Sequence, residues 1–425
     1  MRILKVTQSY APFFEFGGPP VKVCALAERL AQRGHEVTVL TADWGLEKRL
    51  GEGDGKAEAS PFGRRWRNNG VTAEYLGNWW HYRALSWNPA LGRYLRARLK
   101  DFDVVHVYGL YDFFGPRVAK ECRERKIPYV VEPIGMYLPI VRNIWLKKMY
   151  HRVWGTEMLA GADAIVATAE QERAELVAGG VASEKIVVRR NGVEGPAQLP
   201  ERGLFRKKLG IADQAKVVLF LGRLAEKKSP ELLLGAFAGL GKEKRNAETQ
   251  RSQREEKGRV GALRSSAQGS ATNEVHLVFV GPDESGMKGR LEQMARDAGV
   301  AERAHFCGAL DGEAKWMAYR DADIFVLPSQ NENFGNTAAE AVAAGTPVIV
   351  TEHCGIAPLL RDVAGLVVPH QEKALGQALE RLLEDAGLYG ELHKGCAKAL
   401  TTLGWDEPVQ KMEIIYSRLA GACRS

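Results

Sequence analysis

The sequence predicts an α/β protein that consists of two doubly wound parallel-sheet domains. Short apolar runs alternate with helical patterns through most of the 425 residues, and this alternation is typical of parallel strands joined by crossover helices. The alternation restarts after a segment rich in proline and glycine near the middle of the chain. Because one hydrophobic core seldom serves more than about 250 to 300 residues, the length supports the same division.

Each round of the alternation supplies its own set of strands. In the first round a helix over 21–33 separates the first two strands and ends at Gly34, as a C-cap requires. Ligands of doubly wound sheets bind at the carboxyl ends of the strands, so functional residues are expected in the turns there. The expected strands are 3–7, 37–40, 104–107, 129–131 and 165–167 in the first round, and 217–222, 276–281, 324–329 and 347–350 in the second.

The domain boundaries follow from local composition. Residues 191–203 contain two prolines and three glycines and predict an interdomain linker. We therefore expect one domain over 1–195, a second over 196–400, and a terminal segment over 401–425. Residues 241–274 are polar and charged, with too few large apolar side chains to offset the entropy of ordering them, and they predict a flexible surface insertion.

Charge and cysteine content narrow the class of partner and the compartment. The net charge of +7 and the pI near 9.0 favour an anionic partner, such as a nucleotide or an anionic membrane surface. Nucleic acid is also anionic, but no helix-turn-helix, zinc or RNA-binding signature accompanies the charge, so we expect no nucleic-acid partner. The six cysteines form no CxxC pair, which predicts a reducing cytosol rather than a disulfide framework or a zinc site. The first ten residues have the pattern of a buried strand rather than of a signal peptide, and no apolar run of about 18 residues predicts a membrane span.

The most informative stretch covers residues 328–350. A strand ends, a loop follows, and a helix is expected to start near Asn336 or Thr337, just after Phe334 and Gly335. The unpaired N–H groups and the dipole of a helix amino terminus attract phosphate, so this helix start predicts a diphosphate-binding site. Glycine before the helix lets the backbone approach such a ligand closely.

Two glutamates eight positions apart, Glu332 and Glu340, flank this helix start. Carboxylates accept hydrogen bonds from sugar hydroxyls, so one is suited to a sugar and the other to a position further along a nucleotide. Each also has a structural interpretation. Thr337 and Glu340 fit a capping box, in which Glu340 satisfies only the backbone at the helix start. Glu332 alone fits a solvated loop residue.

Further candidates follow the first strand of each half. Arg223 and Lys228 come directly after strand 217–222, where a guanidinium and an ammonium can neutralise a diphosphate leaving group; isolated surface cations are the alternative. Gly17 and Gly18 follow the first strand of the chain and let the backbone approach a donor phosphate or an acceptor. Paired glycines are also common in ordinary turns.

Aromatic and basic side chains are interleaved in two segments of the first half, 64–100 and 142–154. Aromatic groups beside cations suit an anionic membrane interface, and they also suit stacking on sugar rings or bases. The alternative is that the aromatic side chains are core and the cations merely solvated. The aromatic residues concerned are Trp66, Trp79, Trp80, Trp87, Trp145, Tyr150 and Trp154.

Together these motifs resemble the family-4 retaining glycosyltransferases of the GT-B superfamily. The resemblance covers nearly the whole chain: it includes RGHEVTVLTA at 33–42, DVVHVYGL at 103–110, RRNGV at 189–193, FVGPDE at 279–284 and ExFGxxxxEAxAxGTPVI from Glu332. It implies a GT-B fold of two facing Rossmann-like domains, the first binding the acceptor and the second the donor. WDEPVQKMEIIYSRL at 405–419 is similar to the family's terminal helix, which packs back across the first domain.

The resemblance implies roles for individual residues. Glu332 touches the transferred sugar, and Glu340 binds the nucleotide ribose. His106 lies in the family's strand-end histidine motif, but this chain has Tyr108 where members often carry a second histidine, so the acceptor-side roles of both stay open. The residues implied at the diphosphate are Arg223 and Lys228, through their side chains, and Asn336 and Thr337, through their backbone amides.

The implied reaction moves a sugar from a UDP-, GDP- or ADP-sugar to a hydroxyl of a glycan or lipid-linked acceptor, as in polysaccharide or lipopolysaccharide synthesis. It takes place on the front face of the donor, needs neither a cofactor nor a metal ion, and suits a cytoplasmic protein that contacts the inner face of the membrane. Two DxD sequences, at 101–103 and 321–323, immediately precede apolar strands and are expected to be structural. The alternatives are a nucleotide-sugar epimerase of the same fold and a non-catalytic protein that binds sugar nucleotides.

Overall fold

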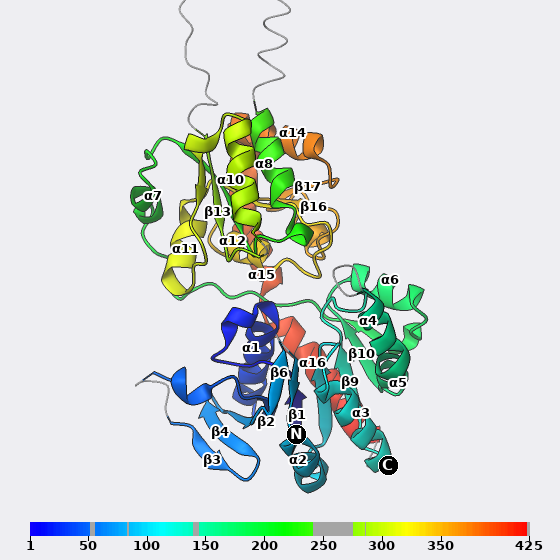
Figure 1. The fold of residues 1–425 in the computed structure, drawn as a ribbon. Helices are drawn as coiled ribbons and strands as arrows, with labels where there is room; N and C mark the ends of the chain where they lie inside the picture. The colour runs from blue at the N-terminus through cyan, green and yellow to red at the C-terminus, as the bar shows by residue number, and fades with distance from the viewer. Residues whose placement is uncertain (52–55, 83–84, 139–143, 241–274, 285, 423–425) are drawn as a thin grey trace, which may run out of the picture. The chain divides into compact units, whose positions relative to one another are not determined.

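The computed structural model describes residues 1–425 with the exception of 52–55, 83–84, 139–143, 241–274, 285 and 423–425. The chain divides into two compact units (Figure 1). Unit 1 consists of Met1–Gly192 and Trp405–Ser425, and unit 2 consists of Val193–Gly404. The chain therefore leaves unit 1 after residue 192 and returns at 405, where we expected boundaries at 195 and 400. The insertion expected over 241–274 lies outside the described residues.

Within the described residues, unit 1 is built on a nine-stranded sheet with the order β11-β10-β9-β8-β1-β2-β5-β4-β3. β4 runs antiparallel to β3 and β5, and the other neighbouring strands are parallel. The five predicted strands are present, but the sequence analysis missed β3, β4, β5 and β11. The strands are β1 (Arg2–Val6), β2 (Glu36–Ala42), β3 (Glu58–Ser60), β4 (Gly63–Asn68), β5 (Val71–Leu76), β8 (Val104–Tyr108), β9 (Tyr129–Glu132), β10 (Ala164–Ala167) and β11 (Ile186–Val188).

Helices cover both faces of this sheet. On the face of Ile3 the sheet packs against α1 and α16, and on the face of Leu4 it packs against α2 and α3. α16 therefore belongs to unit 1, and it contacts α1 and β8. The elements outside the sheet are α1 (Gly18–Gln32), the hairpin of β6 (Trp80–Tyr82) and β7 (Leu85–Trp87), α2 (Ala90–Arg98), α3 (Phe114–Arg125), α4 (Ile144–Tyr150), a π-helix (His151–Gly155), α5 (Thr156–Ala160), α6 (Glu170–Ala178) and α16 (Asp406–Ala422).

α1 begins earlier than predicted, at Gly18 rather than at residue 21. Pro19 and Pro20 occupy its first turn, where the missing N–H groups of proline cost no helical hydrogen bond. The helix ends at Gln32, and Gly34 then adopts a φ of +86°, which glycine tolerates better than other residues. The predicted end of the helix is therefore confirmed, and the predicted start is wrong by three residues.

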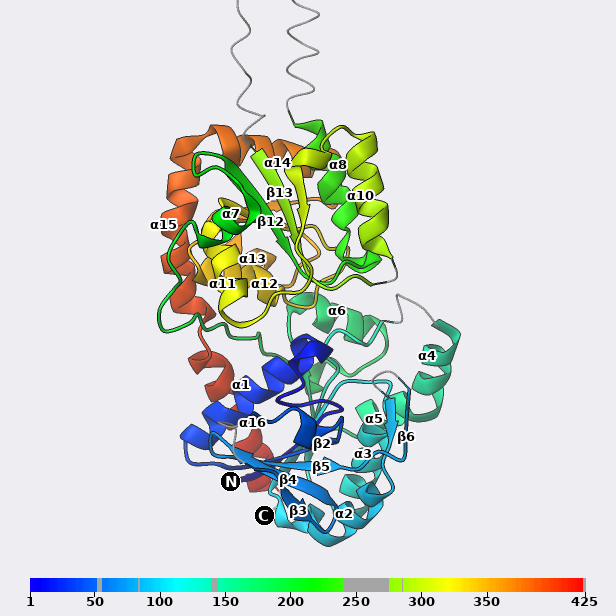
Figure 2. The same ribbon diagram turned by 60° about the vertical axis from the view of Figure 1, so that its left-hand side comes forward.

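In the part of the chain that the structure describes, unit 2 contains a six-stranded parallel sheet with the order β14-β13-β12-β15-β16-β17. The order reverses between β12 and β15, and doubly wound sheets bind ligands at such a switch point. Figure 2 shows α8 and α10 on one side of the strands and α11, α12 and α15 on the other. The strands are β12 (Lys216–Leu221), β13 (Val275–Val280), β14 (Ala304–Phe306), β15 (Ile324–Leu327), β16 (Val348–Thr351) and β17 (Gly365–Val368). The helices are α7 (Leu204–Leu209), α8 (Pro230–Gly239), α10 (Met287–Asp297), α11 (Gly312–Asp321), α12 (Asn336–Ala343), α13 (Ala357–Leu360), α14 (Glu372–Glu384) and α15 (Ala386–Leu403).

Candidate active site

The switch point of unit 2 brings two predicted site residues into contact. Lys228 lies in the loop that follows β12, and Glu332 lies in the loop that follows β15. Their ammonium and carboxylate groups form an ion pair, although the residues are 104 positions apart in the sequence. The side chain of Lys228 is 19% exposed and that of Glu332 is 17% exposed, so the pair is mostly buried but still contacts solvent.

The backbone holds this pair in place from three sides. The N–H of Gln330 donates to the carbonyl of Lys227 at 3.1 Å, which ties the two loops together. The N–H of Glu332 donates to the carbonyl of His353 at 2.9 Å, and its own carbonyl accepts from the N–H of Gly355 at 2.9 Å. Glu332 is therefore a fixed residue, and the interpretation as a solvated loop residue is wrong.

The helix start predicted beside this pair is present. α12 begins at Asn336, and its N-cap is Gly335, which has a φ of +107°. A Cβ atom at position 335 would lie 2.9 Å from Cγ2 of Ile356, so both the conformation and the packing require glycine. Glycine has no side chain that can bond the first-turn amides, and Asn336 and Thr337 are half-buried rather than covered. The positive end of α12 thus lies three residues beyond the carboxylate that pairs with Lys228.

We expected Phe334 among the residues that contact the sugar nucleotide, but the structure turns its ring into the core. Its side chain is 2% exposed and belongs to the core of unit 2. Its carbonyl accepts from the N–H of Ile356 at 2.7 Å. Phe334 therefore anchors the loop before α12 and presents no ring to a ligand.

Glu340 contacts α11 rather than the start of its own helix. Its carboxylate accepts from Nζ of Lys315 at 2.9 Å and from the hydroxyl of Tyr319 at 2.8 Å. The capping-box interpretation with Thr337 is therefore wrong. Burial and the nearby carboxylate of Glu340 raise the pKa of Tyr319 well above its usual value, so this phenol stays a donor. A half-buried carboxylate with two donors retains lone pairs for the hydroxyls of a ligand.

Arg223 lies in the same loop as Lys228, but it pairs with a different carboxylate. Its guanidinium is 62% exposed and pairs with Glu284, in the loop after β13, at 3.2 Å. The two loops are joined because the N–H of Leu224 donates to the carbonyl of Pro282 at 3.0 Å. The structure therefore places both cations at carboxyl ends of neighbouring strands, with Arg223 beside β13 and Lys228 beside β15.

In unit 1 the glycine pair after β1 forms the start of α1. Gly17 has a φ of +96° and is the N-cap, and Gly18 is the first helical residue. A Cβ atom at position 17 would meet nothing within 4 Å. Glycine is thus suited to this position by its conformation, and the expected close approach of this backbone to a donor phosphate or an acceptor stays a prediction.

His106 lies in the interior of unit 1 rather than at an open strand end. β8 runs on to Tyr108, and His106 pairs in register with Lys5 in the middle of the sheet. The imidazole is 0% exposed; its Nδ1 lies 2.6 Å from the hydroxyl of Tyr416, and it stacks on Tyr108 at 4.0 Å. Burial, with Lys5 and Arg189 nearby, lowers the pKa of His106 well below its usual value. In this structure neither His106 nor Tyr108 is accessible to an acceptor.

This histidine belongs to a buried charged cluster that the sequence analysis missed. Glu132 on β9 forms ion pairs with Lys22 of α1 and with Arg189, the latter at 2.6 Å. Although burial alone would raise the pKa of Glu132, Arg189 and Lys22 hold it below its usual value. Nζ of Lys5 donates to the hydroxyl of Tyr108 at 2.6 Å. The one available sequence signal was a lysine inside the apolar strand RILKV, which has no reason to be there unless it has a buried partner.

Both DxD sequences have structural partners. Asp321 accepts from the backbone N–H groups of Gly203, Phe205 and Arg206 at 2.6 to 3.0 Å, and so holds the start of α7. Asp323 pairs with the guanidinium of Arg206 at 2.5 Å. In the other sequence, Asp103 accepts from the N–H of Arg2 at 2.7 Å and Asp101 pairs with Nε of Arg98 at 2.6 Å. All four carboxylates are therefore engaged by the protein, as their position before a strand predicted.

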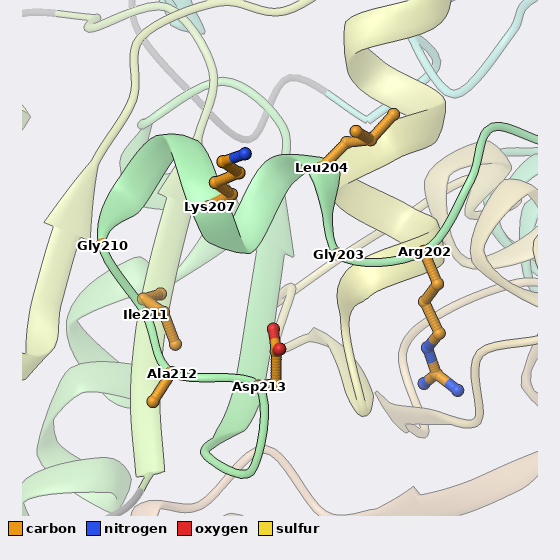
Figure 3. Close-up of a pocket in the computed structure, with 8 residues that line it drawn as sticks. All are labelled: Arg202, Gly203, Leu204, Lys207, Gly210, Ile211, Ala212 and Asp213. Atoms are coloured by element: carbon orange, nitrogen blue, oxygen red, sulfur yellow. The ribbon is translucent and has the colours of Figure 1, made fainter.

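A separate open hollow lies beside α7 (Figure 3). It is lined by Arg202, Gly203, Leu204, Lys207, Gly210, Ile211, Ala212 and Asp213. These residues precede β12, so the hollow lies at the amino end of that strand and not at the switch point. Figure 3 shows that Arg202 and Lys207 point in different directions. The hollow has no convergent set of polar groups, and we assign it no ligand.

Two stretches of the chain match known protein families, one in each unit. Residues 17–192 match the glycosyl transferase 4-like domain, and residues 201–399 match the glycosyl transferases group 1. Two parallel-sheet domains with these two matches define a glycosyltransferase of the GT-B fold. The chain belongs to glycosyltransferase family 4.

Individual relatives agree with this assignment. The D-inositol 3-phosphate glycosyltransferase of Salinispora arenicola is 30% identical over 64% of this chain, and the match spans 58% of that protein's length. An uncharacterized glycosyltransferase of Methanocaldococcus jannaschii is 25% identical over 98% of both chains. The crystal structure of HepE from Anabaena in complex with UDP and glucose has a TM-score of 0.71 and 17% identity, and the match covers 98% of this chain and all of that one. The last likeness shows the shared fold.

Proposed function

We propose that the protein transfers a sugar from a nucleoside-diphosphate sugar to an acceptor hydroxyl with retention of anomeric configuration and without a metal ion. One observation carries the proposal: the Lys228–Glu332 ion pair lies at the switch point of unit 2, beside the amino terminus of α12. A cation and a helix start favour a diphosphate, and a carboxylate favours the hydroxyls of a sugar.

The donor is assigned to this edge of unit 2. The first-turn amides of α12 and the ammonium of Lys228 bind the diphosphate, with Arg223 as a more exposed second cation. Glu332 accepts a hydrogen bond from the transferred sugar, and Glu340 accepts from the ribose. UDP-, GDP- and ADP-sugars all offer these groups, and the UDP in the Anabaena relative supports a uridine donor as the first to test.

The chemistry requires charge stabilisation more than a nucleophile. The bond from the anomeric carbon to the phosphate oxygen breaks, the acceptor oxygen bonds the same carbon on the same face, and the acceptor proton passes to the departing phosphate oxygen. A fixed ammonium and the α12 dipole stabilise the negative charge that develops on the diphosphate. The four DxD carboxylates are engaged by protein donors. Stabilisation of the negative charge on the diphosphate is therefore assigned to Lys228, Arg223 and the α12 dipole rather than to a metal ion.

Acceptor binding is assigned to unit 1, whose own strand order reverses between β1 and β8. A glycan or a lipid-linked sugar is the proposed acceptor class, as in the synthesis of cell-surface polysaccharide or lipopolysaccharide. The basic composition of the chain, with a net charge of +7, supports an acceptor or carrier that bears phosphate.

The test is a thermal-shift screen across UDP-, GDP- and ADP-sugars, followed by analysis of the product formed from the donor that binds. A tight donor raises the unfolding temperature by mass action. The anomeric configuration of the product is then read by NMR, and retention is expected. An inverted product would refute the retaining mechanism, whereas donor isomerisation without any acceptor would reveal an epimerase. Donor binding with no turnover on any acceptor would favour the non-catalytic alternative.

A further inference from the structure

The structure separates the two basic aromatic segments into buried and exposed residues. Trp66 and Tyr150 are 3% and 8% exposed, so the interpretation as core is right for these two. Five tryptophans remain outside the core and need another explanation. They are Trp79 at 81% exposure, Trp145 at 72%, Trp80 at 51%, Trp87 at 50% and Trp154 at 41%.

α4 and the π-helix after it carry the first part of this exposed surface. Their inward side includes Lys147, whose ammonium lies 5.4 Å from the centre of the Tyr111 ring, and His151, whose Nε2 lies 2.8 Å from the Tyr111 hydroxyl. Their exposed side is mostly apolar, with Lys148 and Arg152 also exposed, whereas the exposed side of a water-facing helix is mostly polar. Contiguous exposed apolar surface marks an interaction site. The exposed apolar residues are Ile144, Trp145, Leu146, Met149, Val153 and Trp154.

The β6–β7 hairpin contacts the same loop as α4, although the two are distant in the sequence. Trp87 meets the ring of Phe113 edge to face at 5.7 Å, and Tyr150 meets Tyr111 at 5.2 Å. Both partner rings lie in the loop after β8, so the hairpin and α4 flank one loop. Figure 2 shows α4 and β6 along the same edge of unit 1. Trp80 pairs across the hairpin with Trp87, so it belongs to this group as well.

The charged side chains of α4 and the π-helix are all positive. α4 and the π-helix contain Lys147, Lys148 and Arg152, and residues 133–156 of the sequence include no aspartate or glutamate. The next carboxylate, Glu157, pairs with Arg123 at 2.5 Å. A partner that complements the surface must therefore be both apolar and negatively charged. Tryptophan is enriched where a membrane meets water, and basic residues beside it are attracted by anionic head groups.

We propose that α4, the π-helix and the β6–β7 hairpin form a docking surface for an anionic lipid bilayer, with Trp145 and Trp154 inserted at the level of the head groups. A helix that lies in the interface needs an apolar face and flanking cations, and it does not cross the bilayer. None of the described helices is long and apolar enough to span a membrane. The loop between the two elements leaves the carboxyl end of β8, on the edge of the sheet assigned to the acceptor, so docking holds that edge near a lipid-linked substrate. This last step rests on the proposed function, whereas the docking itself does not.

The experiment is flotation of the full chain with phosphatidylcholine vesicles, with and without phosphatidylglycerol, at low and high salt. We expect the protein to float with the anionic vesicles at low salt and to be released by salt. In the Trp145→Glu/Trp154→Glu variant, the lipid concentration for half-maximal flotation should rise at least about tenfold. The matched control is Ile414→Glu, because Ile414 is 63% exposed on α16, outside the proposed surface, and its variant should float like the wild type.

Three outcomes would overturn the proposal. The first is a wild type that stays in the protein fraction with anionic vesicles at low salt, and the second is a double variant that floats as well as the wild type. Self-association that the double variant abolishes, without any vesicle binding, would assign the surface to a second copy of the chain. Donor-induced thermal shifts, measured on the same proteins, should be equal in all variants, so a failure of docking is distinguished from a failure of the proposed function.

Discussion

Replacing Lys228 by methionine tests the proposed role of the switch-point ion pair. The change keeps the aliphatic stem of the side chain and removes the ammonium that pairs with Glu332. In catalysis, an ammonium about 4 Å from a phosphate that gains one negative charge contributes about 4 kcal/mol at an effective dielectric constant of 20. Since each 1.36 kcal/mol changes a rate about tenfold, full loss of this term lowers kcat about a thousandfold.

The expected effect on folding is much smaller. The pair is 19% and 17% exposed at its two side chains, and partly exposed pairs contribute about 1 kcal/mol or less to stability. Partial exposure also weakens the catalytic term, so we expect kcat of Lys228→Met to fall about 100-fold to 1,000-fold while the free energy of unfolding changes by no more than about 1 kcal/mol.

The assay is release of nucleoside diphosphate from the donor identified by thermal shift, in the presence of acceptor, with unfolding followed in parallel. Lys394→Met is the matched control, because Lys394 is an exposed lysine on α15 and its loss should leave kcat unchanged. Wild-type turnover by a folded Lys228→Met protein would refute the reasoning. A large loss of stability with little loss of kcat per folded molecule would show that the pair is structural.

Three further predictions follow from other contacts. Glu340→Gln removes the charge that Lys315 and Tyr319 hold in place, and we expect it to weaken donor binding in calorimetry more than it lowers kcat. Activity should survive EDTA, whereas loss of activity that a divalent ion restores would contradict the metal-free mechanism. The pKa of buried His106 lies well below its usual value, so the unfolded chain binds a proton below pH 6.5 that the folded chain does not, and stability falls as the pH falls. Between pH 6.5 and 5.5 this proton linkage lowers the free energy of unfolding by about 1 kcal/mol. In denaturant titrations over the same pH interval, the free energy of unfolding of His106→Gln should therefore fall by about 1 kcal/mol less than that of the wild type.

The sheet cores were predictable because both faces of each parallel sheet are buried. Central strands such as β12 and β15 appear in the sequence as continuous apolar runs, and their predicted positions are correct to within about two residues. β4 was missed because it is an edge-side strand with three arginines, and β14 and β17 are only three and four residues long. Strands of that length leave little pattern to detect.

The site was predictable where local chemistry determines it. Gly335 predicted the start of α12, because glycine tolerates the left-handed backbone that the N-cap of this helix adopts. Lys228 and Glu332 meet because β12 and β15, the strands that precede them, are neighbours in the sheet. No local sequence pattern encodes which strands become neighbours. His106 was misjudged for the same reason: its neighbour Lys5 comes from another strand, and together they form part of a buried cluster rather than an open strand end.

Hydrogen exchange of the full chain, with and without saturating nucleoside diphosphate, tests the central claim most directly. The account predicts new protection in two stretches that are distant in sequence and adjacent in space, 222–230 and 330–340, because these carry Lys228, Glu332 and the first turn of α12. Protection confined to residues 202–213, or to unit 1, would place the diphosphate elsewhere and contradict the account.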